Sequence, residues 1–361
     1  MYTNKAAVLY GPKDIRIENR PIPELGPDEV LVRSTDVSIC ATEVKYWRYG
    51  IPNVPLGTKI VQGHELGGIV ESTGEIAKAE IAVGTKVTVD PSLWCGVCDM
   101  CISGMANLCR KLQFMSLPPI DGGFQQFYKV PFKNVHPFPD NLPSDWASLV
   151  EPLCVVLNAI RDAEQLVNSI CNKSIAIIGS GSLGLLLLQA LKLYCQPSFV
   201  AIIDILDYRL KIADSFGVDL TINSKKDDPL EKVYSKTNGI GVDLAFELAG
   251  ELDTYQLSSN LVKPSGTIII VGIPVDQDYI PIRCITARRS GLTLKFVRRF
   301  NPKDFPKSID LIATGKVKVD RLITHSFPLN EINTAFEMVN NYANEIIKAV
   351  IYPQNLYINS D

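Results

Sequence analysis

A run of four cysteines restricts the fold of this chain more than any other segment. The cysteines follow the spacing C-x2-C-x2-C-x7-C, at Cys95, Cys98, Cys101 and Cys109. Thiolates this near in sequence can complete a tetrahedral shell around zinc without ligands from distant segments. Because all four ligands are cysteines, no coordination position stays open for a substrate. The spacing therefore predicts a structural zinc and a compact lobe at about residues 90–112.

Other interpretations of this cluster remain open but are weaker. One alternative is that the four thiols are independent free cysteines. Another is that they hold an iron–sulfur cluster, since short spacings of this kind occur in ferredoxins. A zinc ribbon that binds nucleic acid needs a basic surround, but the nearby charges are mixed. Disulfides are disfavoured among the nine cysteines, because clustered thiols without a secretory signal bind metal more often than they pair.

Length and composition bound the class of protein. With 361 residues, the chain favours two domains, and 46% hydrophobic and 21% charged residues are typical of soluble proteins. A net charge of −3 gives no basic field for nucleic acid. The apolar stretches are too short to span a membrane, and the N-terminus lacks the layout of a signal peptide. We therefore expect a cytoplasmic protein with neither a nucleic-acid nor a membrane partner.

The pattern of strands and helices changes along the chain and predicts an α/β protein. Residues 1–154 contain short alternating strands separated by Gly/Pro turns, which predicts a β-rich domain. From 155 to 292, apolar strands alternate with helices, so we expect a doubly wound parallel sheet. Residues 293–361 are expected to pack back on the first domain. The predicted strands are 30–33, 68–71, 86–89, 174–179, 199–204, 242–247, 266–272 and 347–352, and the predicted helices are 183–194 and 208–216.

A glycine-rich loop opens the second region. Gly179, Gly181 and Gly184 form G-x-G-x-x-G between the strand 174–179 and the helix 183–194. These glycines allow a tight turn, close approach of a pyrophosphate and close helix packing, while the helix N-terminus attracts phosphate. We expect cofactor contacts from the loop, including Ser182 and Leu183.

An acidic residue ends the next strand and bears on which dinucleotide is bound. Asp204 can accept hydrogen bonds from the adenosine ribose and repels a 2′-phosphate, so NAD is favoured over NADP. Arg209 is the nearest cation, and it keeps NADP as the less favoured alternative. A glycine loop that only caps a helix in a nucleotide-free domain is the remaining alternative.

The chain has three histidines, and one of them has metal-site character. His64 stands in the segment GHELGG, beside a carboxylate and among glycines. His136 is expected to be a loop or packing residue, and His325 to make a structural hydrogen bond.

Six motifs occur in one order along nearly the whole chain. They are SICATE at 38–43, GHELGG at 63–68, the cysteine lobe, EPL at 151–153, the glycine loop and LITHSFPL at 322–329. With these motifs the chain resembles the zinc-containing medium-chain dehydrogenases, and within them the sorbitol (polyol) dehydrogenase branch. The resemblance implies a GroES-like catalytic domain, a Rossmann coenzyme domain, a catalytic zinc and a homodimer or homotetramer.

The resemblance also implies the ligands of that catalytic zinc. Cys40 and His64 are expected to bind the metal, and Glu65 to bind it directly or through water. Glu151 occupies the position of a glutamate near the metal in the polyol branch, and it too is expected to bind the zinc directly or through water. Cys154 lies one helical turn further on, where it is an alternative ligand or a small buried residue.

An open zinc position favours the alkoxide of an alcohol, and hydride can then pass to nicotinamide. Thr42 matches the hydroxyl that relatives place beside the substrate oxygen as the first proton relay. Many relatives carry a histidine where this chain has Lys45, so the path beyond Thr42 stays open. Expected substrate contacts are Tyr46, Phe114, Arg298 and Arg299, with core packing or surface exposure as the alternative for each.

The sequence thus predicts a zinc-dependent dehydrogenase that moves a hydride from a secondary alcohol of a polyol or sugar to NAD, with two zinc ions per chain. A butanediol- or threonine-type zinc dehydrogenase is an alternative of the same class. A catalytically silent nucleotide-binding zinc protein is an alternative of another class.

Overall fold

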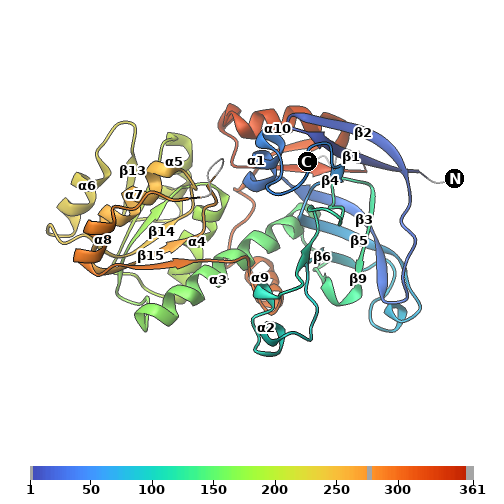
Figure 1. Cartoon of the computed structure of the whole chain (residues 1–361), viewed down its shortest axis with the longest axis horizontal. Helices are drawn as coiled ribbons and strands as arrows, with labels where there is room; N and C mark the ends of the chain where they lie inside the picture. The colour runs from blue at the N-terminus through green and yellow to red at the C-terminus, as the bar shows by residue number, and fades with distance from the viewer. Residues whose placement is uncertain (1–2, 275–278, 355–361) are drawn as a thin grey trace. The chain divides into compact units, whose positions relative to one another are not determined.

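The computed structural model describes residues 3–274 and 279–354. The chain divides into two units. The first unit combines Met1–Cys154 with Asn301–Asp361, and the second consists of Val155–Phe300. In Figure 1 the first unit therefore joins the blue start of the chain to its red end, while the second holds the green-to-orange middle.

The second unit is built on a six-stranded parallel sheet. Its order, β13-β12-β11-β14-β15-β16, turns back at β11, as in doubly wound dinucleotide-binding folds. Strands of such sheets are buried on both faces, which explains the continuous apolar sequence of β11 and β12. The predicted doubly wound sheet is confirmed. The strands are β11 Ser174–Ile178, β12 Phe199–Asp204, β13 Leu220–Asn223, β14 Val242–Glu247, β15 Val262–Ile270 and β16 Thr293–Phe296.

Helices connect these strands. Their bounds are α4 Ser182–Tyr194, α5 Asp207–Ser215, α6 Pro229–Lys236, α7 Leu252–Leu261 and α8 Cys284–Ser290. Helix α3 (Val150–Val167) begins in the first unit and continues into the second. The sequence-based boundary at 292/293 differs from the structural one, because β16 pairs with β15 and so stays with the second unit.

The first unit is mostly antiparallel. Its larger sheet has the order β10-β6-β5-β3-β18-β17, with β9 on β3, and its smaller sheet has the order β2-β1-β4. Apolar residues such as Val32, Leu66 and Val87 form the core of this unit. The strands are β1 Thr3–Gly11, β2 Asp14–Pro21, β3 Glu29–Ser38, β4 Ile60–Val61, β5 Glu65–Thr73, β6 Lys86–Val89, β7 Ser92–Leu93, β8 Gln113–Phe114, β9 Phe127–Pro131, β10 Val135–Pro137, β17 Ile323–Pro328 and β18 Lys348–Tyr352.

The end of the chain completes this first unit. Strand β18 pairs antiparallel with β3, with Val350 opposite Ser38. The helices of the unit are α1 Ala41–Tyr49, α2 Asp99–Ile102, α9 Asp304–Ala313 and α10 Ile332–Asn340. Within the described residues, none of the helices has the length and apolar character needed to cross a membrane.

The close packing of α4 on β11 gives a test of the glycine loop. A Cβ atom on Gly184 would lie 1.9 Å from the carbonyl oxygen of Gly179, whereas one on Gly181 would meet its nearest neighbour, Arg209, at 3.7 Å. Gly184→Ala should therefore lower the free energy of unfolding by about 3 kcal/mol. Gly181→Ala, as control, should cost at most about 1 kcal/mol. Urea unfolding without coenzyme measures both, and equal losses would contradict the packing argument.

Candidate functional site

The ends of β3 and β5 bring three potential metal ligands together. Ser38, the last residue of β3, pairs with Glu65, the first residue of β5. Cys40 follows β3 and caps α1, and His64 directly precedes β5. One ligand atom from each of Cys40, His64 and Glu65 lies within 4.8 Å of the others. A thiolate, an imidazole and a carboxylate form a donor set that zinc accepts, so these residues fit the predicted metal.

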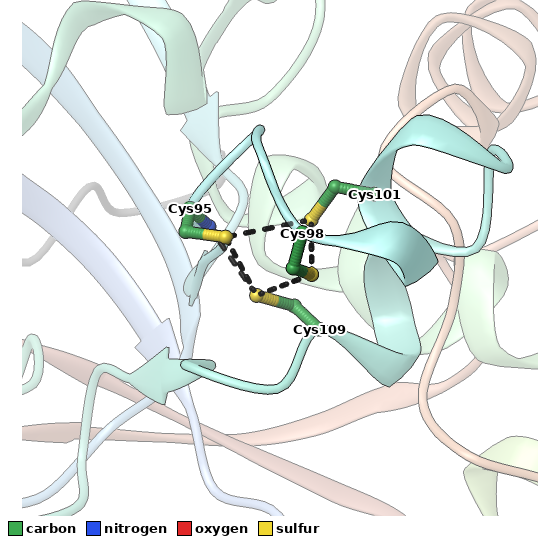
Figure 2. Close-up of side chains that lie close together, drawn as sticks. All are labelled: Cys95, Cys98, Cys101 and Cys109. Carbon is green, nitrogen blue, oxygen red and sulfur yellow. Dashed lines mark hydrogen bonds between the residues drawn. The ribbon is translucent and has the colours of Figure 1, made fainter.

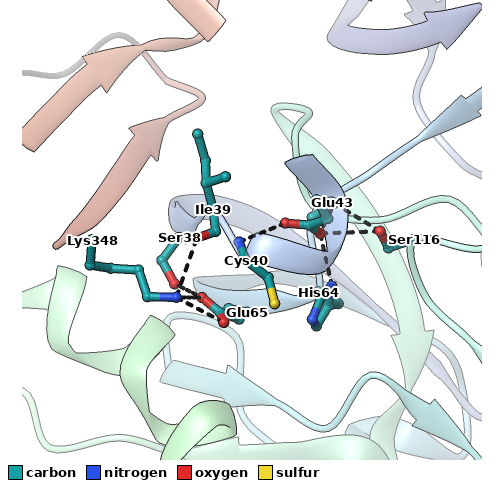
Figure 3. A network of polar contacts seen from close by, with 9 residues as sticks. Ser38, Ile39, Cys40, Glu43, His64, Glu65, Ser116 and Lys348 are labelled. Carbon is teal, nitrogen blue, oxygen red and sulfur yellow. Dashed lines mark hydrogen bonds and ion pairs between the residues drawn. The ribbon is translucent and has the colours of Figure 1, made fainter. Parts of the chain in front are cut away.

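Glu43 holds this arrangement from helix α1. Its Oε2 accepts from the backbone N–H of Cys40 at 3.0 Å, and its Oε1 accepts from the N–H of Gly63 at 2.7 Å. The same Oε1 lies 2.8 Å from Nδ1 of His64, and Ser116 donates to it at 3.1 Å. With Nδ1 of His64 committed to a carboxylate, Nε2 is the ring nitrogen left for a metal. Figure 3 shows Glu43 between these partners.

The pairing changes the proton affinity of both side chains. Burial by itself lowers the pKa of His64, but its interactions with Glu43 and Cys40 raise the pKa well above its ordinary value. Burial by itself raises the pKa of Glu43, yet His64 and the surrounding N–H donors lower it overall. Glu43 is therefore a charged carboxylate that orients the ring, the role a second carboxylate plays in many zinc sites.

Lys348 neutralises Glu65 from strand β18. Its Nζ donates to Oε1 of Glu65 at 2.9 Å and to Oε2 at 2.6 Å, and to the carbonyl of Ile39 at 3.2 Å. The hydroxyl of Ser38 also donates to Glu65 (Figure 3). Glu65 and Lys348 are both almost fully buried. Burial by itself lowers the pKa of Lys348, but Glu65 and Cys40 raise it, so the lysine keeps its charge.

Glu151 borders the group of three ligands without joining it. Among the described residues, the metal-ligating group at this place contains Cys40, His64 and Glu65. Burial, together with the charge of Glu65, raises the pKa of Glu151 to about 8. The site therefore disfavours a further negative charge until a cation is present, which is consistent with metal binding. Cys154 donates to the hydroxyl of Ser308 at 3.3 Å and is fully buried, as expected for a small core residue.

The residues expected near a substrate are distributed over both units. Thr42 and Tyr46 lie half-buried on α1. Phe114 is buried, with its ring centroid 5.3 Å from that of His64. Arg298 and Arg299 belong to the second unit; Arg298 is exposed, and the carbonyl of Arg299 accepts from Asn158 at 3.1 Å. The substrate roles of all five residues stay predictions.

The other two histidines make structural contacts. The ring of His136 stacks on Phe305 with centroids 4.5 Å apart, and burial lowers its pKa to about 4. Nδ1 of His325 lies 3.0 Å from the hydroxyl of Thr324.

The cysteine lobe brings its four sulfur atoms together (Figure 2). Cys95 follows β7, Cys98 caps α2, Cys101 lies on α2 and Cys109 ends the next short turn. The Sγ–Sγ distances are 3.6 Å for 98–101, 3.5 Å for 109–95, 3.9 Å for 98–109 and 4.0 Å for 95–101. A tetrahedron with Zn–S bonds of about 2.3 Å has edges of about 3.8 Å, so the four sulfurs fit zinc.

Backbone N–H groups point at these sulfurs. The N–H groups of Cys95 and Lys111 donate to Sγ of Cys109 at 3.3 and 3.4 Å. A hydrogen bond from the backbone of Arg110 is the main reason that the pKa of Cys98 falls to about 6. Desolvation raises the pKa of Cys101 to about 12, so four thiolates require a cation among them.

The glycine loop lies at the carboxyl end of β11 in the second unit. Gly179 has φ +103, a conformation that favours glycine, and its N–H donates to the carbonyl of Ile203 at 2.8 Å. Gly181 caps α4 without a side-chain hydrogen bond. The first N–H groups of α4, which begins with Ser182 and Leu183, have no intrahelical partner and can bind a pyrophosphate.

Asp204 ties this loop to the end of β12. Its Oδ2 accepts from the N–H of Ser180 at 2.7 Å, and its Oδ1 accepts from Ile205 at 2.7 Å and Leu206 at 3.0 Å. Arg209 approaches Asp204 at 3.8 Å. Asp204 thus has a structural role that the sequence did not reveal.

Several supporting residues were missed in the sequence. Glu43 belonged to a recognised motif but received no role. Lys348 had a signal, because one lysine interrupts an apolar strand and a buried cation needs a partner. The sequence gives no signal for Ser38 or Ser116, since serines are common near turns. Glu247 also went unnoticed: it is buried at the end of β14 and accepts from the N–H groups of Ala249 and Gly250 at 3.0 and 2.8 Å.

Each of the two units contains a segment that matches a known protein family. The alcohol dehydrogenase GroES-like domain matches residues 26–140, and the zinc-binding dehydrogenase domain matches residues 182–314. A protein of Bacillus subtilis (strain 168) named sorbitol dehydrogenase is 32% identical over 97% of both chains. Fold and ligand sets therefore define a zinc-binding dehydrogenase.

Solved structures extend the comparison. An Escherichia coli oxidoreductase/dehydrogenase of unknown specificity is 31% identical, with a TM-score of 0.88 over 97% of this chain and 99% of that one. A Sinorhizobium meliloti 1021 structure described as a zinc-binding dehydrogenase bound to NADP is 29% identical, with a TM-score of 0.87 over 98% and 100%. The chain belongs to the zinc-containing medium-chain dehydrogenase family, in the branch that includes sorbitol dehydrogenases, and its family implies zinc and a nicotinamide cofactor.

The buried Lys348–Glu65 pair gives a test of the site's construction. Lys348→Met should lower the free energy of unfolding by about 3–5 kcal/mol, because Glu65 is left buried without a cation. Lys129→Met removes an exposed partner of Glu29 in the same unit and should cost at most about 1 kcal/mol. Adding Glu65→Gln to Lys348→Met should recover part of the loss. Urea unfolding measures all three, and equal losses in the two single variants would contradict the assignment.

Proposed function

We propose that this protein oxidises a secondary hydroxyl of a polyol or sugar and transfers the hydride to NAD. The main observation behind this proposal is that Cys40, His64 and Glu65 lie together in a buried site. Glu43 and Lys348 hold His64 and Glu65 in place there. The matched Bacillus subtilis relative, which is named for sorbitol, supports the substrate class.

Each residue has a distinct part in this reaction. Cys40, His64 and Glu65 would hold zinc, with Glu151 as a nearby carboxyl group. Bound zinc supplies Lewis acidity, which eases loss of the hydroxyl proton from an alcohol near neutral pH. Glu43 fixes the orientation of His64, and Lys348 offsets the charge of Glu65. The side chains of Glu65, Lys348 and Phe114 are buried, and this burial limits access of water to the site.

Proton removal requires a path from the hydroxyl to solvent. Thr42, half-buried and two residues after Cys40, has the hydroxyl for the first step. Lys45 is half-buried on the same helix, and a protonated ammonium group donates but does not accept a proton. We therefore propose that the relay runs from Thr42 through water or the coenzyme ribose rather than through Lys45.

We infer that the lobe of Cys95, Cys98, Cys101 and Cys109 holds a second zinc with a structural role. Its four sulfurs are spaced for a closed tetrahedral shell, which has no position for substrate.

NAD is the proposed coenzyme. Three backbone N–H groups hold the side chain of Asp204 at the end of β12, where an adenosine ribose would lie and where a carboxylate would repel a 2′-phosphate. Arg209, beside Gly181, is the feature that favours NADP, and the Sinorhizobium meliloti relative was solved with that coenzyme.

Substrate class can be tested by NADH production with alditols, aldoses, inositols, 2,3-butanediol and threonine. We expect the highest kcat/KM with an alditol or sugar, because the relative that matches 97% of this chain is named for sorbitol. A clear preference for butanediol or threonine would move the enzyme to another branch. No turnover with any alcohol, in protein containing two zinc ions per chain, would support the silent alternative.

The two metal sites predict opposite phenotypes. Cys40→Ser should remove more than about 99% of turnover while leaving the melting temperature nearly unchanged. The reason is that the proposed catalytic zinc, with its open coordination position, supplies chemistry rather than folding energy. Cys101→Ser should lower the melting temperature, because a structural zinc contributes folding energy. Zinc content by plasma mass spectrometry should fall by one ion per chain in each variant. Near-normal turnover of Cys40→Ser would refute the site assignment.

Coenzyme choice is tested at Asp204. Asp204→Ala should shift the NAD/NADP ratio of kcat/KM toward NADP by roughly tenfold or more, equivalent to about 1.4 kcal/mol. Asp204→Asn is the closer control, because it removes the charge and its single amide oxygen can still accept from the backbone on one side, either from Ser180 or from Ile205 and Leu206. If Asp204→Asn behaves as wild type, charge does not decide the preference, and a wild-type protein that already prefers NADP would overturn the proposal.

A further inference from the structure

Two cysteines outside the metal sites lie on neighbouring loops of the second unit. Cys171 stands in the turn between α3 and β11, and Cys195 ends α4 before β12. The next residues are joined by backbone hydrogen bonds: Asn172 donates to the carbonyl of Gln196, and Ser198 donates to that of Lys173, both at 3.0 Å. The two thiols interact with each other across these paired segments.

The surroundings of the two thiols differ. Cys171 is exposed, and interactions with the Ser169 hydroxyl and then the Cys195 thiol lower its pKa. Cys195 is 3% exposed, and burial raises its pKa to about 12. Its S–H donates to Oε1 of Glu164 at 3.6 Å. An accessible thiol with more thiolate character beside a protected second thiol is the arrangement of reversible peroxide-sensitive pairs.

We propose that Cys171 and Cys195 form a reversible modification site, in which hydrogen peroxide converts the exposed Cys171 and its buried neighbour Cys195 into a disulfide. Cys171 is the residue that peroxide oxidises first, and Cys195 is the resolving residue.

The chemistry balances in two steps. The thiolate of Cys171 attacks one peroxide oxygen; the O–O bond breaks, a sulfenic acid forms and hydroxide leaves. The sulfur of Cys195 then attacks the sulfur of Cys171, forming the S–S bond while the S–O bond breaks. The departing hydroxide takes the proton of Cys195 and leaves as water. A dithiol reductant reverses the modification by thiol–disulfide exchange.

The position of the pair determines the effect. Cys171 and Cys195 precede the amino ends of β11 and β12, whereas the glycine loop follows the carboxyl end of β11. Five residues of strand separate these ends by about 17 Å. The disulfide would join the α3–β11 turn to the α4–β12 loop and stabilise the second unit without reaching the coenzyme loop.

Peptide mapping tests the proposal. Zinc-loaded, full-length protein is treated with a small excess of hydrogen peroxide, alkylated and digested without reductant for mass spectrometry. We expect the Cys171–Cys195 linked peptide as the main product, its loss on reduction with dithiothreitol, and unchanged NADH binding. Closing the loop should raise the melting temperature by roughly 5 °C or more.

Variants identify the role of each thiol. In Cys195→Ser, peroxide should leave a sulfenic acid on Cys171 that dimedone traps. Cys284→Ser removes the exposed lone cysteine of the same unit and should leave the yield of linked peptide unchanged. The proposal is overturned if wild-type protein gives no Cys171–Cys195 peptide, or if Cys171 links to Cys284 as readily. This wild-type result decides the question even if Cys195→Ser does not fold.

Discussion

The ion pair between Lys348 and Glu65 is the interaction on which the organisation of the first unit depends. It joins residues 283 positions apart, and both side chains are almost completely buried. A buried carboxylate without a partner is strongly disfavoured, so Glu65 can open β5 beside Cys40 and His64 only if a cation comes from elsewhere. Strand β18 brings that cation when it pairs with β3. The chain end is thereby required for the site as well as for the sheet.

Charge balance also explains how the site can be ready for a metal. Glu43 holds the side chain of His64 and Lys348 holds that of Glu65, so protein contacts fix the orientation of both ligands. Such preorganisation is what a catalytic metal needs, because ligands on loops alone hold position poorly. In the cysteine lobe the same problem has a different answer: backbone N–H groups face the sulfurs, and sequence proximity replaces the long-range strands.

The sequence predicted the doubly wound sheet and the parts of the site carried by short spacings. The spacing of the glycines predicted the loop before α4, and the spacing of the cysteines predicted the zinc lobe. Both features are formed by residues close together in the sequence. Long-range partners were beyond reach: Ser38 reaches Glu65 only through the β3–β5 register, and Ser116 reaches Glu43 across 73 residues. The boundary after β16 was missed for the same reason, since a four-residue edge strand has little periodicity of its own.

The cysteines of this chain suit different chemical roles, and the groups around each sulfur determine which role it has. Thiols beside N–H donors and other thiols suit a closed zinc shell, and Cys40 beside His64 and Glu65 suits an open one. Cys154 is enclosed by the core and bonded to Ser308, which leaves it inert. Cys171 and Cys195 belong to neither metal-ligating group of the described residues, and oxidation is the chemistry that we propose for them. Counting cysteines therefore says less about function than the charges and donors around each sulfur.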